Sequence, residues 1–129
     1  MRLLRIFSWA VIAAVFGTAA SAAEDTGGNF SNILSDVGAY GRAISIARAC
    51  GMTDDRADRA VSMVMVYAYA AAKPNFSDVD GKRMFLVEVV ERVSRRHKVE
   101  QPAKALCARS FKALDHLPRR LDEAVRRNG

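Results

Sequence analysis

The sequence has 129 residues, of which 20 are Lys or Arg and 14 are Asp or Glu, so its formal net charge at pH 7 is +6. A chain of this length forms one domain and can bury a core without many disulfide bonds. No aromatic residues are interleaved with the arginines, which argues against a base-stacking platform and against a nucleic-acid partner.

The N-terminus has the layout of a secretory signal peptide over residues 1–22. Arg2 and Arg5 precede an apolar run of about fifteen residues, which ends in small residues at 20–22, whereas a membrane-spanning helix needs roughly 20. We predict cleavage after Ala22 and a periplasmic or secreted location; the alternative is a retained membrane anchor. No cysteine follows the apolar run, so the chain is not expected to be a lipoprotein. Residues 23–29 are predicted to be a flexible leader and residues 30–129 a helical domain.

Two helices are predicted in the first half of this domain. The first spans Ser31 to Cys50, because apolar residues recur three and four positions apart at Ile33, Val37, Tyr40, Ile44 and Ala47. Gly51 suits the left-handed residue after a helix end. Thr53 suits the N-cap of a second helix from Asp54 to Ala72, which Lys73-Pro74 ends.

The second half predicts two further helices and a tail. A helix from Asp78 to His97 would turn Phe85, Leu86, Val89, Val90 and Val93 inward, with ion pairs from Glu88 to Arg92 and from Glu91 to Arg95. A helix from Pro102 to Leu117 follows, and Pro118 would separate it from a short fifth helix over 119–129. The predicted fold is therefore an all-α, small four-helix bundle with a short C-terminal fifth helix. The alternative is an α+β fold with a strand at 84–90.

The two cysteines, Cys50 and Cys107, are 57 positions apart. An exported chain with two cysteines is expected to join them in a disulfide bond, and closing such a loop contributes about 4 kcal/mol in the chain-entropy model. The sequence has no C-x-x-C motif and no zinc-ligand spacing. Free or intermolecular thiols are the alternative.

No catalytic motif is present: the sequence lacks G-x-S-x-G, a P-loop, G-x-G-x-x-G and H-E-x-x-H. We therefore predict no enzymatic activity, no cofactor and no metal site. The helix from Asp54 to Ala72 is apolar on nearly all sides, and its surplus face carries Met63, Val66 and Ala70. This face must be buried by the tail helix, pair with a second copy of the chain or receive another protein, and we predict contact with another protein.

The charge is uneven along the chain: residues 24–80 hold eight acidic and five basic residues, and residues 81–129 hold six acidic and thirteen basic ones. Seven basic residues are candidate contacts to an anionic partner, although a solvated surface is the simpler reading: Arg95, Arg96, Lys98, Arg119, Arg120, Arg126 and Arg127. The predicted function is that of a small exported helical protein that contacts another protein, with a chaperone-like role in envelope stress. The alternative is a cationic secreted protein acting at anionic membrane or envelope surfaces.

Overall fold

The computed structural model describes residues 29–128, and the predicted signal peptide and all but the last residue of the predicted leader lie outside this range. Within it the structure has helices and no strand: α2 (Asn29–Ala49), α3 (Asp54–Ala72), the 3-10 turn η2 (Lys73–Asn75), α4 (Val79–Ser94) and α5 (Lys104–Asn128). The all-α prediction is confirmed. The α+β alternative is wrong, because residues 84–90 lie inside α4.

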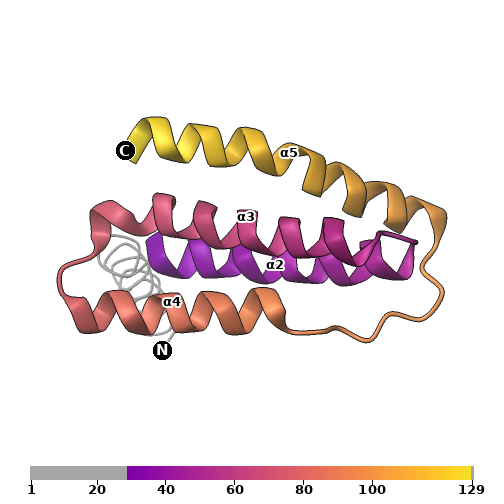
Figure 1. Ribbon diagram of the computed structural model, residues 1–129, viewed down its shortest axis with the longest axis horizontal. Coiled ribbons are helices and arrows are strands. Elements are labelled where there is room, and N and C mark those ends of the chain that lie inside the picture. Colours follow the sequence, from indigo (N-terminus) through magenta and orange to yellow (C-terminus); the bar gives the residue numbers. More distant parts are fainter. Residues whose placement is uncertain (1–28, 129) are drawn as a thin grey trace, which may run out of the picture.

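Helices α2 and α3 form the middle of the bundle, and each packs against both α4 and α5. Figure 1 shows α4 and α5 on opposite sides of this central pair. All five apolar residues that predicted the inner stripe of α2 are buried: Ile33, Val37, Tyr40, Ile44 and Ala47. They meet the buried side of α3, where Val64 and Ala68 are fully enclosed. The core therefore lies around α2, as the three- and four-residue spacing of its apolar residues predicts.

The corner between α2 and α3 is built as its sequence predicts. Gly51 has a φ of 103°, a left-handed conformation that glycine adopts without steric cost. The N–H of Met52 donates to the carbonyl of Ala47 at 2.8 Å, which closes the end of α2. The Thr53 side chain accepts a hydrogen bond from the N–H of Arg56 at 3.3 Å and caps α3.

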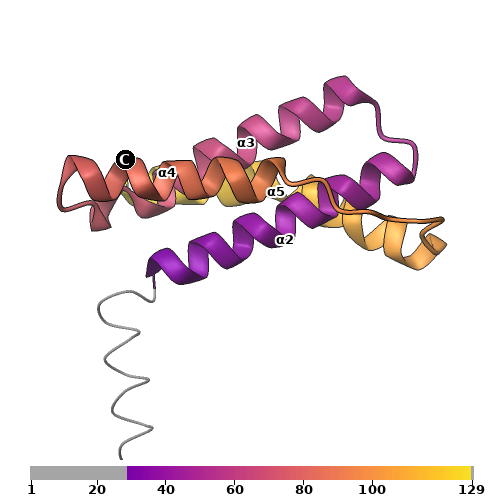
Figure 2. The same ribbon diagram turned by 90° about the horizontal axis from the view of Figure 1, so that it is seen from below.

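Helix α4 ends at Ser94, three residues before the predicted end, and the chain then runs without helix to residue 103. Figure 2 shows this linker reaching the end of the bundle where α5 begins. An extended residue advances about 3.3 Å and a helical one 1.5 Å, so nine extended residues cover about 30 Å. The backbone N–H of His97 donates to Ser45 Oγ at 3.2 Å, so the linker is attached to α2.

Helix α5 is one continuous helix, and the prediction that Pro118 separates a short fifth helix is wrong. A proline inside a helix removes one backbone hydrogen bond, which usually costs about 3 kcal/mol. Here the flanking turns are both held by packing. Leu114 and Leu117 are buried before the proline, and Ala124 is buried after it. Burial on both sides offsets the lost bond, and the helix continues.

The predicted disulfide bond is confirmed. The sulfur atoms of Cys50 and Cys107 are 2.08 Å apart and their Cα atoms are 5.9 Å apart. The bond joins the end of α2 to the first turn of α5, at the end of the bundle that the linker reaches.

Candidate functional site

The main exposed apolar surface lies on α4, and we call it the α4 face. It consists of four large exposed side chains: Val79 (71% exposed), Met84 (72%), Val87 (53%) and Val90 (47%). The opposite side of the same helix is buried through Phe85, Val89 and Val93. The helix is therefore apolar on two sides, and one of these sides has no partner within residues 30–128.

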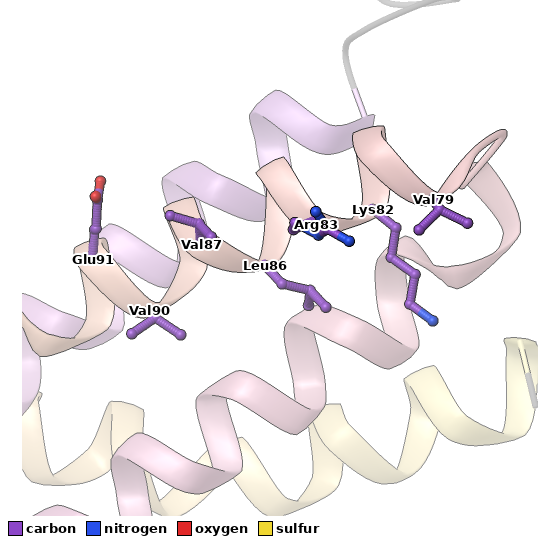
Figure 3. Close-up of a pocket in the computed structure, with 7 residues that line it drawn as sticks. All are labelled: Val79, Lys82, Arg83, Leu86, Val87, Val90 and Glu91. Atoms are coloured by element: carbon purple, nitrogen blue, oxygen red, sulfur yellow. The ribbon is translucent and has the colours of Figure 1, made fainter.

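A shallow groove of about 570 Å³ runs along this part of α4 (Figure 3). Seven residues line it, all from α4: Val79, Lys82, Arg83, Leu86, Val87, Val90 and Glu91. In Figure 3 Leu86 and Val90 point toward α3, and Glu91 points away from it. At the N-terminal end of the groove, Lys82 Nζ lies 3.4 Å from Tyr69 Oη and 5.1 Å from the centre of the Tyr69 ring. This contact joins α4 to α3 beside the groove.

The charges of the groove are separated along α4. Lys82 and Arg83 lie near its N-terminal end, and Glu91 lies near its C-terminal end. The expected ion pair between Glu91 and Arg95 is not formed, because the helix ends at Ser94 and Arg95 is extended. Among the ion pairs of the described chain, none includes Arg83 or Glu91. The expected pair between Glu88 and Arg92 is formed, at 2.8 Å.

The contact face predicted on the second helix, α3, is only partly exposed in the structure. Met63 and Ala70 are half-buried against the core, and Asn128 Nδ2 of α5 donates to the Ala70 carbonyl at 3.3 Å. Val66 alone of the three is strongly exposed, at 52%. The C-terminal half of α5 therefore covers part of the surplus face of α3.

The α4 face was not predicted from the sequence. Val90 was expected to point into the core together with Val89 and Val93, but it is exposed. Met84, Val87 and Val90 are three positions apart, which is a helical spacing that places them on one side. That regular spacing was the signal that could have found the face.

Arg120 lies at the meeting point of α2, α3 and α5. Its guanidinium donates to Tyr40 Oη at 2.9 Å, to Asp36 Oδ2 at 3.0 Å and to Tyr67 Oη at 2.9 Å. It also lies over the rings of both tyrosines, 5.7 Å from the centre of Tyr40 and 5.0 Å from that of Tyr67. Of the arginines predicted to contact an anionic partner, this one is bound within the fold.

The protonation of this cluster follows from its surroundings. The pKa of Tyr67 is raised from 10.0 to about 12, mainly because the phenol is buried; the charge of Arg120 opposes this rise, and the charge and hydrogen bond of Asp36 add to it. Burial by itself would lower the pKa of Arg120, but its hydrogen bonds to Tyr40 and Asp36 outweigh that effect, and the pKa is raised. The cluster thus joins a neutral phenol, a carboxylate and a permanent cation.

The other predicted basic contacts are spread over the surface. Arg126 pairs with Asp122, four positions earlier in α5, at 2.6 Å, and Arg119 Nη2 lies 3.4 Å from His116 Nδ1. The remaining four are exposed, three of them on the linker: Arg95, Arg96, Lys98 and Arg127. The structure therefore does not bring the seven together.

A second hollow of about 440 Å³ lies on the other side of α4, between α4 and α2. Its lining includes one acidic residue, Glu88, and four basic residues: Arg42, Arg92, Arg95 and His97. Arg42 was not among the predicted contacts, because it comes from a helix whose sequence carries no basic cluster.

Within residues 29–128 no three metal-binding side chains come together, and no helix combines the length and apolarity needed to cross a bilayer. Comparisons of this chain with protein-family models, with curated proteins and with solved structures gave no match. Its function is therefore inferred from its own surfaces.

Proposed function

We propose that this chain is a small exported protein-binding protein and that the α4 face is the surface by which it contacts other polypeptide chains, in a chaperone-like role in the cell envelope. The observation that carries this proposal is the exposure of Val79, Met84, Val87 and Val90 on a single helix. Contiguous exposed apolar residues with a charged rim are typical of protein-interaction surfaces.

The energetics favour covering this face. Fully burying a valine or methionine side chain stabilises by roughly 1.5–3 kcal/mol, so removing the exposed part of each side chain from water contributes about 1 kcal/mol. Glu91 and Arg83, which border the groove and have no ion-pair partner among the residues that the structure describes, supply the polar rim. The surface thus has the apolar centre and charged edge of a binding site for a polypeptide.

The predicted export supports the same role. The signal-peptide pattern of residues 1–22 predicts export to an oxidising compartment, in which the disulfide bond between Cys50 and Cys107 would persist. The disulfide bond holds the end of α2 to the first turn of α5, and α4 packs against α2 and α3.

The test compares two lysine substitutions at equally exposed valines. Light scattering follows the aggregation of heat-unfolded citrate synthase with the wild type, Val87→Lys and Val66→Lys, after circular dichroism has shown that all three are folded at the assay temperature. The two valines are 53% and 52% exposed. We expect the wild type and Val66→Lys to suppress aggregation and Val87→Lys to lose most of this activity. A wild type without effect, or equal loss in both variants, would overturn the proposal.

The hollow between α2 and α4 favours a second candidate function, contact with an anionic membrane or envelope surface. Arg42, Arg92 and Arg95 converge there, although Glu88 neutralises Arg92. Pelleting with anionic liposomes at low salt should be reduced in the double variant Arg42→Ser/Arg95→Ser and unchanged in Arg126→Ser, whose arginine is already paired with Asp122. Absence of pelleting by the wild type at low salt would exclude this candidate.

A further inference from the structure

The residues along the α4 face are ordered so that two antiparallel copies of the face match each other. Successive helical residues are about 100° apart, so seven residues of α4 fall within about 120° of its surface: Asp80, Arg83, Met84, Val87, Val90, Glu91 and Ser94. Val87 lies four positions from Arg83 and four from Glu91, so it is the centre of this pattern. Between Asp80 and Ser94, which are equally distant from Val87, this side of the helix thus has a base, then apolar residues, then an acid.

We infer that the α4 face binds the α4 face of a second copy of this chain, with the two helices antiparallel and a two-fold axis near Val87. This inference rests on the proposed function, because it names the occupant of the same face. In this arrangement the Arg83 end of each helix lies beside the Glu91 end of the other, and Met84 lies at the height of Val90. Because the contact is two-fold symmetric, each favourable pairing occurs twice.

Charge selects this orientation over its alternatives. A parallel, in-register arrangement would place Arg83 beside Arg83 and Glu91 beside Glu91, and such like-charge contacts are unfavourable. The antiparallel arrangement gives both residues the ion-pair partners that they lack among the described residues. Long arginine and glutamate side chains can reach across a pair of helices packed 8–10 Å apart.

The size of the contact sets its strength. Helix α4 has 16 residues and is therefore about 24 Å long, so one helix-to-helix contact belongs to the small, transient class of interfaces. We expect a dimer that forms with a Kd on the order of 10–100 micromolar, in which the apolar residues supply the attraction and the charges supply the orientation.

Sedimentation velocity over a wide range of protein concentration tests the inference on the whole chain. We expect the wild type to pass from monomer to dimer as its concentration rises. Arg83→Glu alone and Glu91→Arg alone should each weaken the dimer about 10-fold or more, because two like-charge contacts appear in place of two ion pairs. The double variant Arg83→Glu/Glu91→Arg should restore it, because both pairings then exist with their signs exchanged.

Two results would overturn the self-association. One is a wild type that stays monomeric up to millimolar concentration, and the other is a dimer whose strength none of the three charge variants changes. The proposed function is tested separately by the aggregation assay. A monomeric wild type whose Val87→Lys variant still loses aggregation suppression would refute the second copy as occupant and leave the proposed function standing. A charge-dependent dimer without aggregation suppression would refute the proposed function and leave the second copy as the occupant of the α4 face.

Discussion

Gly41 lies where the backbones of α2 and α4 approach each other closely, and we predict that Gly41→Ala destabilises the protein. A Cβ atom at residue 41 would lie 2.6 Å from the carbonyl oxygen of Arg92 and 3.3 Å from the Cα of Val93. Ordinary van der Waals contacts of a Cβ are 3.4–4 Å. Both obstacles are backbone atoms, so the two helices must separate by about 1 Å rather than let a flexible side chain move aside.

The expected magnitude follows from two opposing effects. Overpacking of a filled interior costs about 1–3 kcal/mol, while replacing a helical glycine with alanine contributes about 0.8–1 kcal/mol of helix propensity. Because the 2.6 Å contact is with a backbone atom, we expect an overpacking cost of about 2–3 kcal/mol, and the net expectation for Gly41→Ala is a loss of about 1–2 kcal/mol in the free energy of unfolding. For a domain of this size, 1 kcal/mol corresponds to a Tm change of about 4–8 °C.

Gly38 is the matched control on the same helix. A Cβ atom at residue 38 meets nothing within 4 Å, so Gly38→Ala should stabilise the protein by about 0.5–1 kcal/mol. Urea unfolding, analysed at equal m-values, measures both variants against the wild type. The two shifts should have opposite signs. A Gly41→Ala variant as stable as the wild type would refute the close approach of the backbones, and with it the position of α4 from which its exposed face follows.

Three further predictions concern the cluster at Arg120 and the disulfide bond. Arg120→Ala should lower the free energy of unfolding by about 2 kcal/mol, because three hydrogen bonds of a half-exposed cation are lost. Arg126→Ala is the control and should lower it by at most about 0.5 kcal/mol. Equal losses for the two variants in chemical unfolding would contradict this prediction. The pKa of Tyr67 is raised above its unfolded value, so its contribution to stability should be full below pH 10 and be lost as the pH rises to about 12. A spectrophotometric titration of the wild type without a step near pH 12 that Tyr67→Phe lacks would disprove this. Reducing the bond between Cys50 and Cys107 should lower the free energy of unfolding by about 4 kcal/mol, and an unchanged urea midpoint after reduction would contradict the prediction.

Local signals predicted much of the fold correctly. The corner from Cys50 to Thr53 has the glycine, the cap and the helix ends that its residue types require, and α3 has the predicted bounds, Asp54–Ala72. These features depend on interactions between residues three to five positions apart, which a sequence displays directly. The pairing of the two cysteines was predictable as well, because their number allows one intramolecular bond.

Local signals failed where distant parts of the chain decide the outcome. The valine-rich and arginine-rich segment of α4 predicts a helix as far as His97, but the linker must reach the end of α2 so that Cys107 can meet Cys50. Pro118 predicts a break, but buried leucines on one side and Ala124 on the other keep α5 continuous. In both places packing or a covalent bond outweighs a local preference of a few kcal/mol.

The candidate surfaces, too, were predictable in part from local sequence and in part only from the packed structure. The sequence shows a surplus of apolar residues on two helices and a surplus of arginines in the second half, because both are properties of composition and spacing. It does not show which apolar face another helix covers. Met63 and Ala70 on α3 are half-buried, and Asn128 of α5 donates a hydrogen bond to the Ala70 carbonyl, while Met84, Val87 and Val90 on α4 remain exposed. Likewise, Arg120 looks like any surface arginine until α2 and α3 bring Asp36, Tyr40 and Tyr67 around it. Residue type and spacing by themselves determine where helices form and which of their sides are apolar, but burial is a relation between segments far apart in the chain, and only the packed bundle decides it.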